Sequence, residues 1–97
     1  SLKNDSKIVQ QIETIKSERN RLIRELKLIE VVTKIYPTDA NFILLEIENA
    51  SDVYLKLISK GIVVRNRSKI IQNTLRISIG TETENNFLLT ELNKLKQ

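Results

Sequence analysis

Cysteine and histidine are both absent from this sequence. The lack of cysteine excludes a disulfide framework and thiolate chemistry. The lack of histidine as well leaves no ordinary ligand set for zinc or copper, and it excludes the usual Ser–His and Cys–His nucleophile pairs. We therefore expect no metal site and no nucleophile of those types in the chain.

Aromatic residues and long apolar runs are scarce. The aromatic residues are Tyr36, Phe42, Tyr54 and Phe87, so Ile, Leu and Val must build the core. No apolar run approaches the ~20 residues that span a bilayer, and no signal peptide opens the sequence, so we expect a cytoplasmic protein that meets no membrane. A length of 97 residues, with 40% apolar and 29% charged residues, is typical of one soluble globular domain.

Basic residues outnumber acidic ones, which gives the chain a formal net charge of +4. Both signs are interspersed, however, and residues 16–27 carry Glu18 and Glu25 among the bases. This pattern is typical of a solvated helix face with i,i+4 ion pairs. No aromatic residue lies among the bases in the way that a stacking platform for single-stranded nucleic acid needs, so we expect no nucleic-acid partner.

Hydrophobic spacing predicts one long amphipathic helix over residues 5–29, capped by Asn4 or Asp5. Its apolar stripe, which Arg19 interrupts, comprises Ile8, Ile12, Ile15, Leu22, Leu26 and Ile29. Steps of three and four place these side chains on one face. Because the stripe covers barely three heptads, we expect it to pack against a sheet rather than to self-associate.

Four strands and two further helices are predicted downstream. β-branched and alternating residues indicate strands at 30–35, 41–48, 62–65 and 74–79, with a turn at Pro37 after the first. A helix is expected from Ala50 or Ser51 to Lys60, with Ser51 as its cap and Gly61 as its stop. Thr81 and Glu84 form a capping box that opens a helix to about residue 95. The buried face of that helix is expected to be Phe87, Leu88, Leu92 and Leu95.

The predicted order of elements is α-β-β-α-β-β-α. Runs of this kind indicate the α+β class, with the helices packed on one face of a single sheet. The connections at Pro37 and after Arg67 are too short for crossover helices. We therefore expect a small, mostly antiparallel sheet of about four strands.

Two arginines stand out on the predicted strands. Strand 74–79 alternates, so that Arg76 and Ser78 face away from its three apolar residues, and Arg65 ends the preceding strand. A guanidinium on a sheet face that becomes covered needs an anionic partner, and its planar fork suits a carboxylate or a phosphate. From the residues alone, an exposed or ion-paired strand residue is the simpler interpretation of both arginines.

Three strings in the second half share the order and residues of a known family: Tyr36-Pro37-Thr38-Asp39-Ala40-Asn41-Phe42, Gly61-Ile62-Val63-Val64-Arg65 and Leu75-Arg76-Ile77-Ser78-Ile79-Gly80-Thr81-Glu82-Thr83-Glu84-Asn85. Together they resemble the C-terminal small domain of histidinol-phosphate aminotransferase, a pyridoxal-phosphate enzyme of histidine biosynthesis. The resemblance covers residues 18–95. It implies that residues 1–97 form one aminotransferase small domain, whose partner is a large domain elsewhere in the same enzyme chain.

The resemblance implies roles for three residues. Arg76 matches the arginine that binds the anionic end of the substrate, and Arg65 matches one that helps to hold the phosphate of histidinol phosphate. Asn41 matches an asparagine that orients the nearby loop, although a turn residue that satisfies backbone groups is an equal interpretation. The implied reaction is reversible amino transfer between histidinol phosphate and 2-oxoglutarate, which yields imidazole acetol phosphate and glutamate.

The resemblance also implies what the chain leaves to the rest of the enzyme. The Schiff-base lysine and the other cofactor-holding residues match nothing here. Lys69 follows Ser68 as in the family's lysine motif, but it lies in a loop where no cofactor is expected. We therefore expect the full-length enzyme to be a homodimer that binds pyridoxal phosphate. We expect this chain alone to carry no cofactor and no catalytic residue, and to be inactive.

There are two alternatives to the interpretation as a small domain of histidinol-phosphate aminotransferase. Threonine-phosphate decarboxylases and related aminotransferases have similar endings, so the chain could come from another phosphate-recognising pyridoxal-phosphate enzyme. A free-standing α+β module that binds an anion or a nucleic acid is the alternative from another class.

Overall fold

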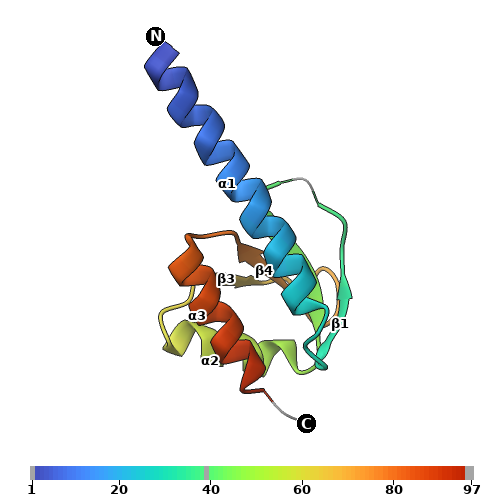
Figure 1. The fold of residues 1–97 in the computed structure, drawn as a ribbon. Coiled ribbons are helices and arrows are strands. Elements are labelled where there is room, and N and C mark those ends of the chain that lie inside the picture. The colour runs from blue at the N-terminus through green and yellow to red at the C-terminus, as the bar shows by residue number, and fades with distance from the viewer. Residues whose placement is uncertain (1, 39, 96–97) are drawn as a thin grey trace.

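The computed structural model describes residues 2–38 and 40–95, with side chains from residue 9 onward. In these residues the order of elements is α-β-β-α-β-β-α, as predicted (Figure 1). The elements are α1 (Leu2–Leu26), β1 (Val32–Ile35), β2 (Phe42–Ile47), α2 (Ala50–Ser59), β3 (Val64–Asn66), β4 (Thr74–Ser78) and α3 (Glu82–Asn93).

The strands of the described part form one sheet in the order β1-β2-β4-β3, and each neighbouring pair is antiparallel. The antiparallel prediction is confirmed. Helices α1, α2 and α3 lie over one face of this sheet, and no described residue forms a helix on the opposite face (Figure 1). The fold is thus a two-layer α+β arrangement. We call the sheet face that carries no helix the open face.

The core lies between the sheet and the helices. Alternation along β2 buries Ile43, Leu45 and Ile47, and along β4 it buries Leu75 and Ile77. Val64 of β3 and aliphatic residues from the helices and their connections complete this core: Leu22, Leu26, Ile29, Val31, Ala50, Val53, Leu57, Leu88, Leu89 and Leu92. Every member is aliphatic, as the scarcity of aromatic residues predicts.

Helix α1 divides into a packed half and a projecting half. Leu22 and Leu26 are fully buried, whereas Val9, Ile12 and Ile15 are exposed, Ile12 by 47%. A 25-residue helix is about 37 Å long at 1.5 Å per residue. It therefore extends past the sheet and α3 (Figure 1). The prediction that the whole apolar stripe packs on the sheet is wrong for Ile12 and Ile15, and the side chain of Ile8 lies outside the described ones.

The boundaries of several elements differ from the predicted ones. The first helix ends at Leu26 rather than at residue 29, and Ile29 is buried in the turn that follows. The third strand occupies Val64–Asn66 rather than residues 62–65. Phe87, expected in the buried face of α3, is 43% exposed.

No helix in the described part of the chain is long and apolar enough to cross a membrane.

The end of α2 explains the shift of the third strand. Gly61 has a φ of 82°, and its N–H donates to the Ile58 carbonyl at 3.0 Å. The N–H of Ile62 donates to the Leu57 carbonyl, also at 3.0 Å. These two bonds form a Schellman motif, which confirms Gly61 as the stop but uses residues 61–62 for the cap. The strand can therefore begin only later.

The three predicted helix starts have different outcomes. The cap of the first helix at Asn4 or Asp5 is wrong, because α1 already begins at Leu2. The capping box of α3 is confirmed, because Glu84 N–H donates to the Thr81 hydroxyl and Thr81 N–H donates to the Glu84 carboxylate at 2.8 Å. The predicted Ser51 cap of α2 is wrong. The N-cap residue of α2 is Asn49, which has a left-handed backbone and makes no side-chain cap bond. The hydroxyl of Ser51 instead accepts a hydrogen bond from the Asn66 side chain at 3.2 Å.

Candidate functional site

The open face of the sheet carries the residues that alternate with the buried ones. Strand register places these side chains together: Lys34 and Tyr36 at β1, Phe42, Leu44 and Glu46 on β2, Arg65 on β3, and Arg76 and Ser78 on β4. Antiparallel partners point to the same side of a sheet. The open face therefore has a basic side toward β3 and an apolar centre on β2.

The two arginines singled out by sequence are direct neighbours on the open face. Arg65 of β3 pairs with Arg76 of β4, and Leu44 of β2 pairs with Arg76 from the other side. Within residues 9–38 and 40–95, neither arginine is within 4.0 Å of an acidic side chain. Like charges at directly paired positions repel each other. An anion bound between the two guanidinium groups would relieve that repulsion and use their hydrogen-bond donors.

Aromatic rings also lie beside the bases of the open face. The guanidinium carbon of Arg76 is 4.9 Å from the centre of the Phe42 ring, and Lys34 Nζ is 4.6 Å from that of Tyr36. Phe42 and Arg76 are far apart along the chain, so the order of residues could not indicate this contact. It depends on the pairing of β2 with β4, which only the folded sheet supplies.

Asn41 lies just before the start of the inner strand β2 and is not the strand partner of either arginine. It is exposed and directly precedes β2, and its backbone carbonyl accepts a hydrogen bond from the Ile79 N–H at 2.9 Å. The partner of Arg76 on β2 is Leu44, three residues further along. This backbone bond does not depend on the Asn41 side chain, so the role of Asn41 stays a prediction.

A buried polar cluster that the sequence analysis missed joins α1 to α3. The Glu18 carboxylate accepts hydrogen bonds from Arg21 Nη2 at 2.8 Å, from Arg21 Nε at 3.1 Å and from the Asn85 amide at 2.8 Å. Asn85 also bonds both backbone groups of Gly80 at 3.0 Å. Glu18 is 8% exposed and Asn85 2%, so the prediction that Glu18 lies on a solvated face is wrong.

The charge of Glu18 is stabilised by its partners. The Arg21 hydrogen bonds, followed by the Asn85 amide, hold the pKa of the Glu18 carboxyl below its ordinary value, although burial acts in the opposite direction. The spacing of Glu18 and Arg21, three apart on one helix, was the available sequence signal. No buried side-chain polar atom of the cluster lacks a hydrogen-bond partner, so the cluster fixes Gly80 and the start of α3 relative to α1.

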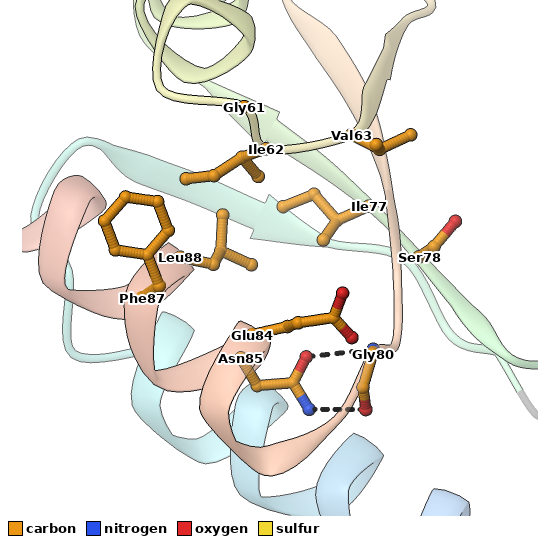
Figure 2. Close-up of a pocket in the computed structure, with 10 residues that line it drawn as sticks. All are labelled: Gly61, Ile62, Val63, Ile77, Ser78, Gly80, Glu84, Asn85, Phe87 and Leu88. Atoms are coloured by element: carbon orange, nitrogen blue, oxygen red, sulfur yellow. Dashed lines mark hydrogen bonds between the residues drawn. The ribbon is translucent and has the colours of Figure 1, made fainter.

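A cavity of about 270 Å³ lies at the other side of the sheet, between α3 and the segment before β3 (Figure 2). Its floor is formed by the buried Ile77 and Leu88, and Phe87 and Val63 lie at its rim. Neither Arg65 nor Arg76 lines it. The polar groups around it, Gly80, Glu84 and Asn85, are engaged in the bonds that start α3. The arginine pair, rather than this cavity, is the better candidate site.

Similar proteins are found by sequence and by structure. No protein-family model matches the chain. The histidinol-phosphate aminotransferase of Flavobacterium psychrophilum is 48% identical over 86 residues, which are 87% of this chain and 25% of that protein. The crystal structure of histidinol-phosphate aminotransferase from Clostridium acetobutylicum superposes with a TM-score of 0.84 at 31% identity, over 96% of this chain and 29% of that one.

A decarboxylase from Sulfurospirillum multivorans is also similar, with a TM-score of 0.74 and 31% identity over 84% of this chain and 22% of that one. The chain spans about a quarter of the length of the curated relatives it matches. The similarity therefore concerns one segment of each of these proteins.

Proposed function

The chain is homologous to a segment of histidinol-phosphate aminotransferase, and from this premise we propose that it is the substrate-binding small domain of such an enzyme. The whole enzyme would exchange an amino group between histidinol phosphate and 2-oxoglutarate in histidine biosynthesis. The observation that carries the proposal is the direct pairing of Arg65 with Arg76 on a sheet face that no helix covers. A domain placed over that face would enclose the two arginines with the substrate.

In this proposal the paired arginines hold the anionic groups of both substrates. Two guanidinium forks can bind a phosphate through several charge-assisted hydrogen bonds, each of which contributes about 1.5–3 kcal/mol when it is shielded from water. The same donors can hold a carboxylate of glutamate in the other half of the reaction. Arg76 is half-buried and stacks on Phe42, whereas Arg65 is exposed. Arg76 is therefore the more constrained of the pair, and we assign it the larger contribution.

The residues present do not fit a cofactor site. Every lysine whose side chain the structure describes is exposed, including Lys69 in the turn between β3 and β4. A lysine that forms a Schiff base needs a desolvated or electropositive pocket that lowers its pKa. We infer that pyridoxal phosphate, which supplies the electron sink for amino transfer, is held by residues outside this chain, and that the chain alone is inactive.

The proposal is tested in a full-length enzyme that contains this chain. Arg76→Ala should lower the rate of both half-reactions by orders of magnitude while the cofactor stays bound, and Arg65→Ala should chiefly weaken the binding of histidinol phosphate. Arg24→Ala is a matched control, since Arg24 is exposed on α1, away from the open face. The half-reactions are followed by the absorbance of the cofactor. Near-normal turnover of Arg76→Ala would show that Arg76 does not hold the anionic groups of the substrates.

A second candidate function is that of a related phosphate-recognising pyridoxal-phosphate enzyme, which the similarity to the decarboxylase from Sulfurospirillum multivorans favours. The same arginine pair would serve there, but the substrate would lose carbon dioxide instead of transferring its amino group. Release of carbon dioxide from a phosphorylated amino acid by the full-length enzyme would support this candidate. Salt-dependent binding of RNA or DNA would instead support a free-standing binding module.

A further inference from the structure

Phe42 has a contact that its place in the sequence does not explain. In the register of β2 and β4, Phe42 pairs with Ser78 and Leu44 pairs with Arg76. Phe42 is therefore the diagonal neighbour of Arg76 on the open face, within reach for an aromatic side chain. The guanidinium carbon of Arg76 lies 4.9 Å from the ring centre, inside the ~6 Å limit of a cation–π contact.

The ring acts on the side of Arg76 that faces away from Arg65. Arg65, paired with Arg76 across β3 and β4, carries the same charge and repels it. Phe42 attracts the Arg76 guanidinium toward β2. An arginine without such a contact must give up the freedom of its long side chain when it binds an anion, which weakens binding. An arginine that is already held against a ring loses less.

We propose that Phe42 is a positioning residue, which orients the Arg76 guanidinium for the phosphate or carboxylate of the substrate. This inference rests on the proposed function of Arg76. A ring that merely packs on the sheet makes a different prediction, because leucine would then replace it at a cost in stability with no specific cost in anion binding. The two roles can therefore be separated by measurements on variants.

The test uses a full-length enzyme that contains this chain, with Phe42→Leu and Phe42→Tyr. Leucine removes the π face and keeps an apolar side chain, whereas tyrosine keeps the ring. The measurements are kcat, KM for histidinol phosphate, and the dissociation constant of inorganic phosphate by calorimetry. Phe87→Leu is the matched control, because Phe87 is half-exposed on α3, on the helix side of the sheet.

Loss of a cation–π contact corresponds to roughly 3- to 30-fold in affinity. We expect Phe42→Leu to raise KM and the phosphate dissociation constant by that factor, with a smaller change in kcat. Tyrosine should restore most of the affinity, and Phe87→Leu should not change it. The effect of Phe42→Leu on phosphate binding should also disappear when Arg76 is already alanine, because no guanidinium remains to be oriented.

The results distinguish this inference from the proposed function. If Arg76→Ala binds phosphate like the wild type, both the function of Arg76 and the role of Phe42 are wrong. If Arg76→Ala weakens binding but Phe42→Leu does not, only the role of Phe42 is wrong, and the same holds if Phe42→Leu acts equally in the Arg76→Ala background. If Phe42→Leu unfolds the sheet, phosphate binding is measured with Phe42→Met, which also removes the ring but has a longer apolar side chain.

Discussion

Replacement of Asn85 by alanine should destabilise the chain far more than its small change in volume suggests. The Asn85 side chain makes one hydrogen bond to the Glu18 carboxylate at 2.8 Å and two to the backbone of Gly80 at 3.0 Å. A bond to a charged group contributes about 1.5–3 kcal/mol and a neutral one about 0.5–1.5 kcal/mol. The expected loss is therefore about 2.5–6 kcal/mol, a large share of the ~5–15 kcal/mol that stabilises a typical domain.

The assay is urea unfolding of the 97-residue chain, followed by far-ultraviolet circular dichroism. Asn86→Ala is the matched control, because Asn86 is the next residue on α3 and its side chain is exposed. Its free energy of unfolding should stay within about 0.5 kcal/mol of the wild type. If Asn85→Ala unfolds at the same urea concentration as Asn86→Ala, the cluster does not join α1 to α3 as described.

Asn85→Asp adds a dependence on pH to the same test. It removes the amide donor and places a second carboxylate against Glu18, which is already ionised because its pKa is lowered. Two buried carboxylates at that distance cannot both stay charged, so the variant should be least stable near neutral pH. Its deficit relative to the wild type should shrink as the solution becomes acidic, since a protonated aspartic acid can again donate to Glu18. A deficit that is equal at pH 7 and pH 4 would contradict the charge argument.

Three further predictions concern the rest of the fold. The pKa of Glu18 is below its ordinary value of 4.5 in the folded state, so the unfolded state binds more protons in acid. The stability that ionised Glu18 contributes is therefore present above pH 4.5 and is lost as the pH falls through the folded pKa. Glu18→Gln should flatten that part of the stability–pH curve. Gly61→Ala should cost about 1–2 kcal/mol, because φ is 82° although the space for a methyl group is free, and Gly61→Asn should cost less in the same urea assay. Leu22→Ala should cost about 2–5 kcal/mol and Ile12→Ala less than about 0.5 kcal/mol, because only Leu22 is buried; equal losses would show that the projecting half of α1 is packed in solution.

Local signals in the sequence predicted the parts of the fold that depend on neighbouring residues. The capping box at Thr81 and Glu84, the stop at Gly61 and the alternation around Arg76 all act over a few residues, and all are present. The packing of the long helix was predicted wrongly for a tertiary reason. The apolar stripe at Ile12 and Ile15 has the right spacing for a packed face, but α1 extends beyond the elements that could cover it.

The candidate site shows the same division. Arg65 and Arg76 could be chosen individually from their strands and from the family resemblance. Their direct pairing depends on the register of β3 and β4, and the Phe42 contact depends on that of β2 and β4. Glu18 was misread as a surface charge because its partner Asn85 lies 67 residues away in the sequence. Periodicity along one helix cannot indicate a partner on another.

The central claim is that Arg65 and Arg76 together recognise the phosphate of the substrate. The most direct measurement compares kcat/KM for histidinol phosphate and for histidinol, in a full-length enzyme that contains this chain and in its Arg65→Ala and Arg76→Ala variants. The arginine pair predicts a strong preference of the wild type for the phosphorylated substrate, which falls by at least tenfold in each variant, since each lost charge-assisted bond corresponds to about 1.5–3 kcal/mol. A preference that survives both substitutions unchanged would place phosphate recognition elsewhere in the enzyme and contradict the account.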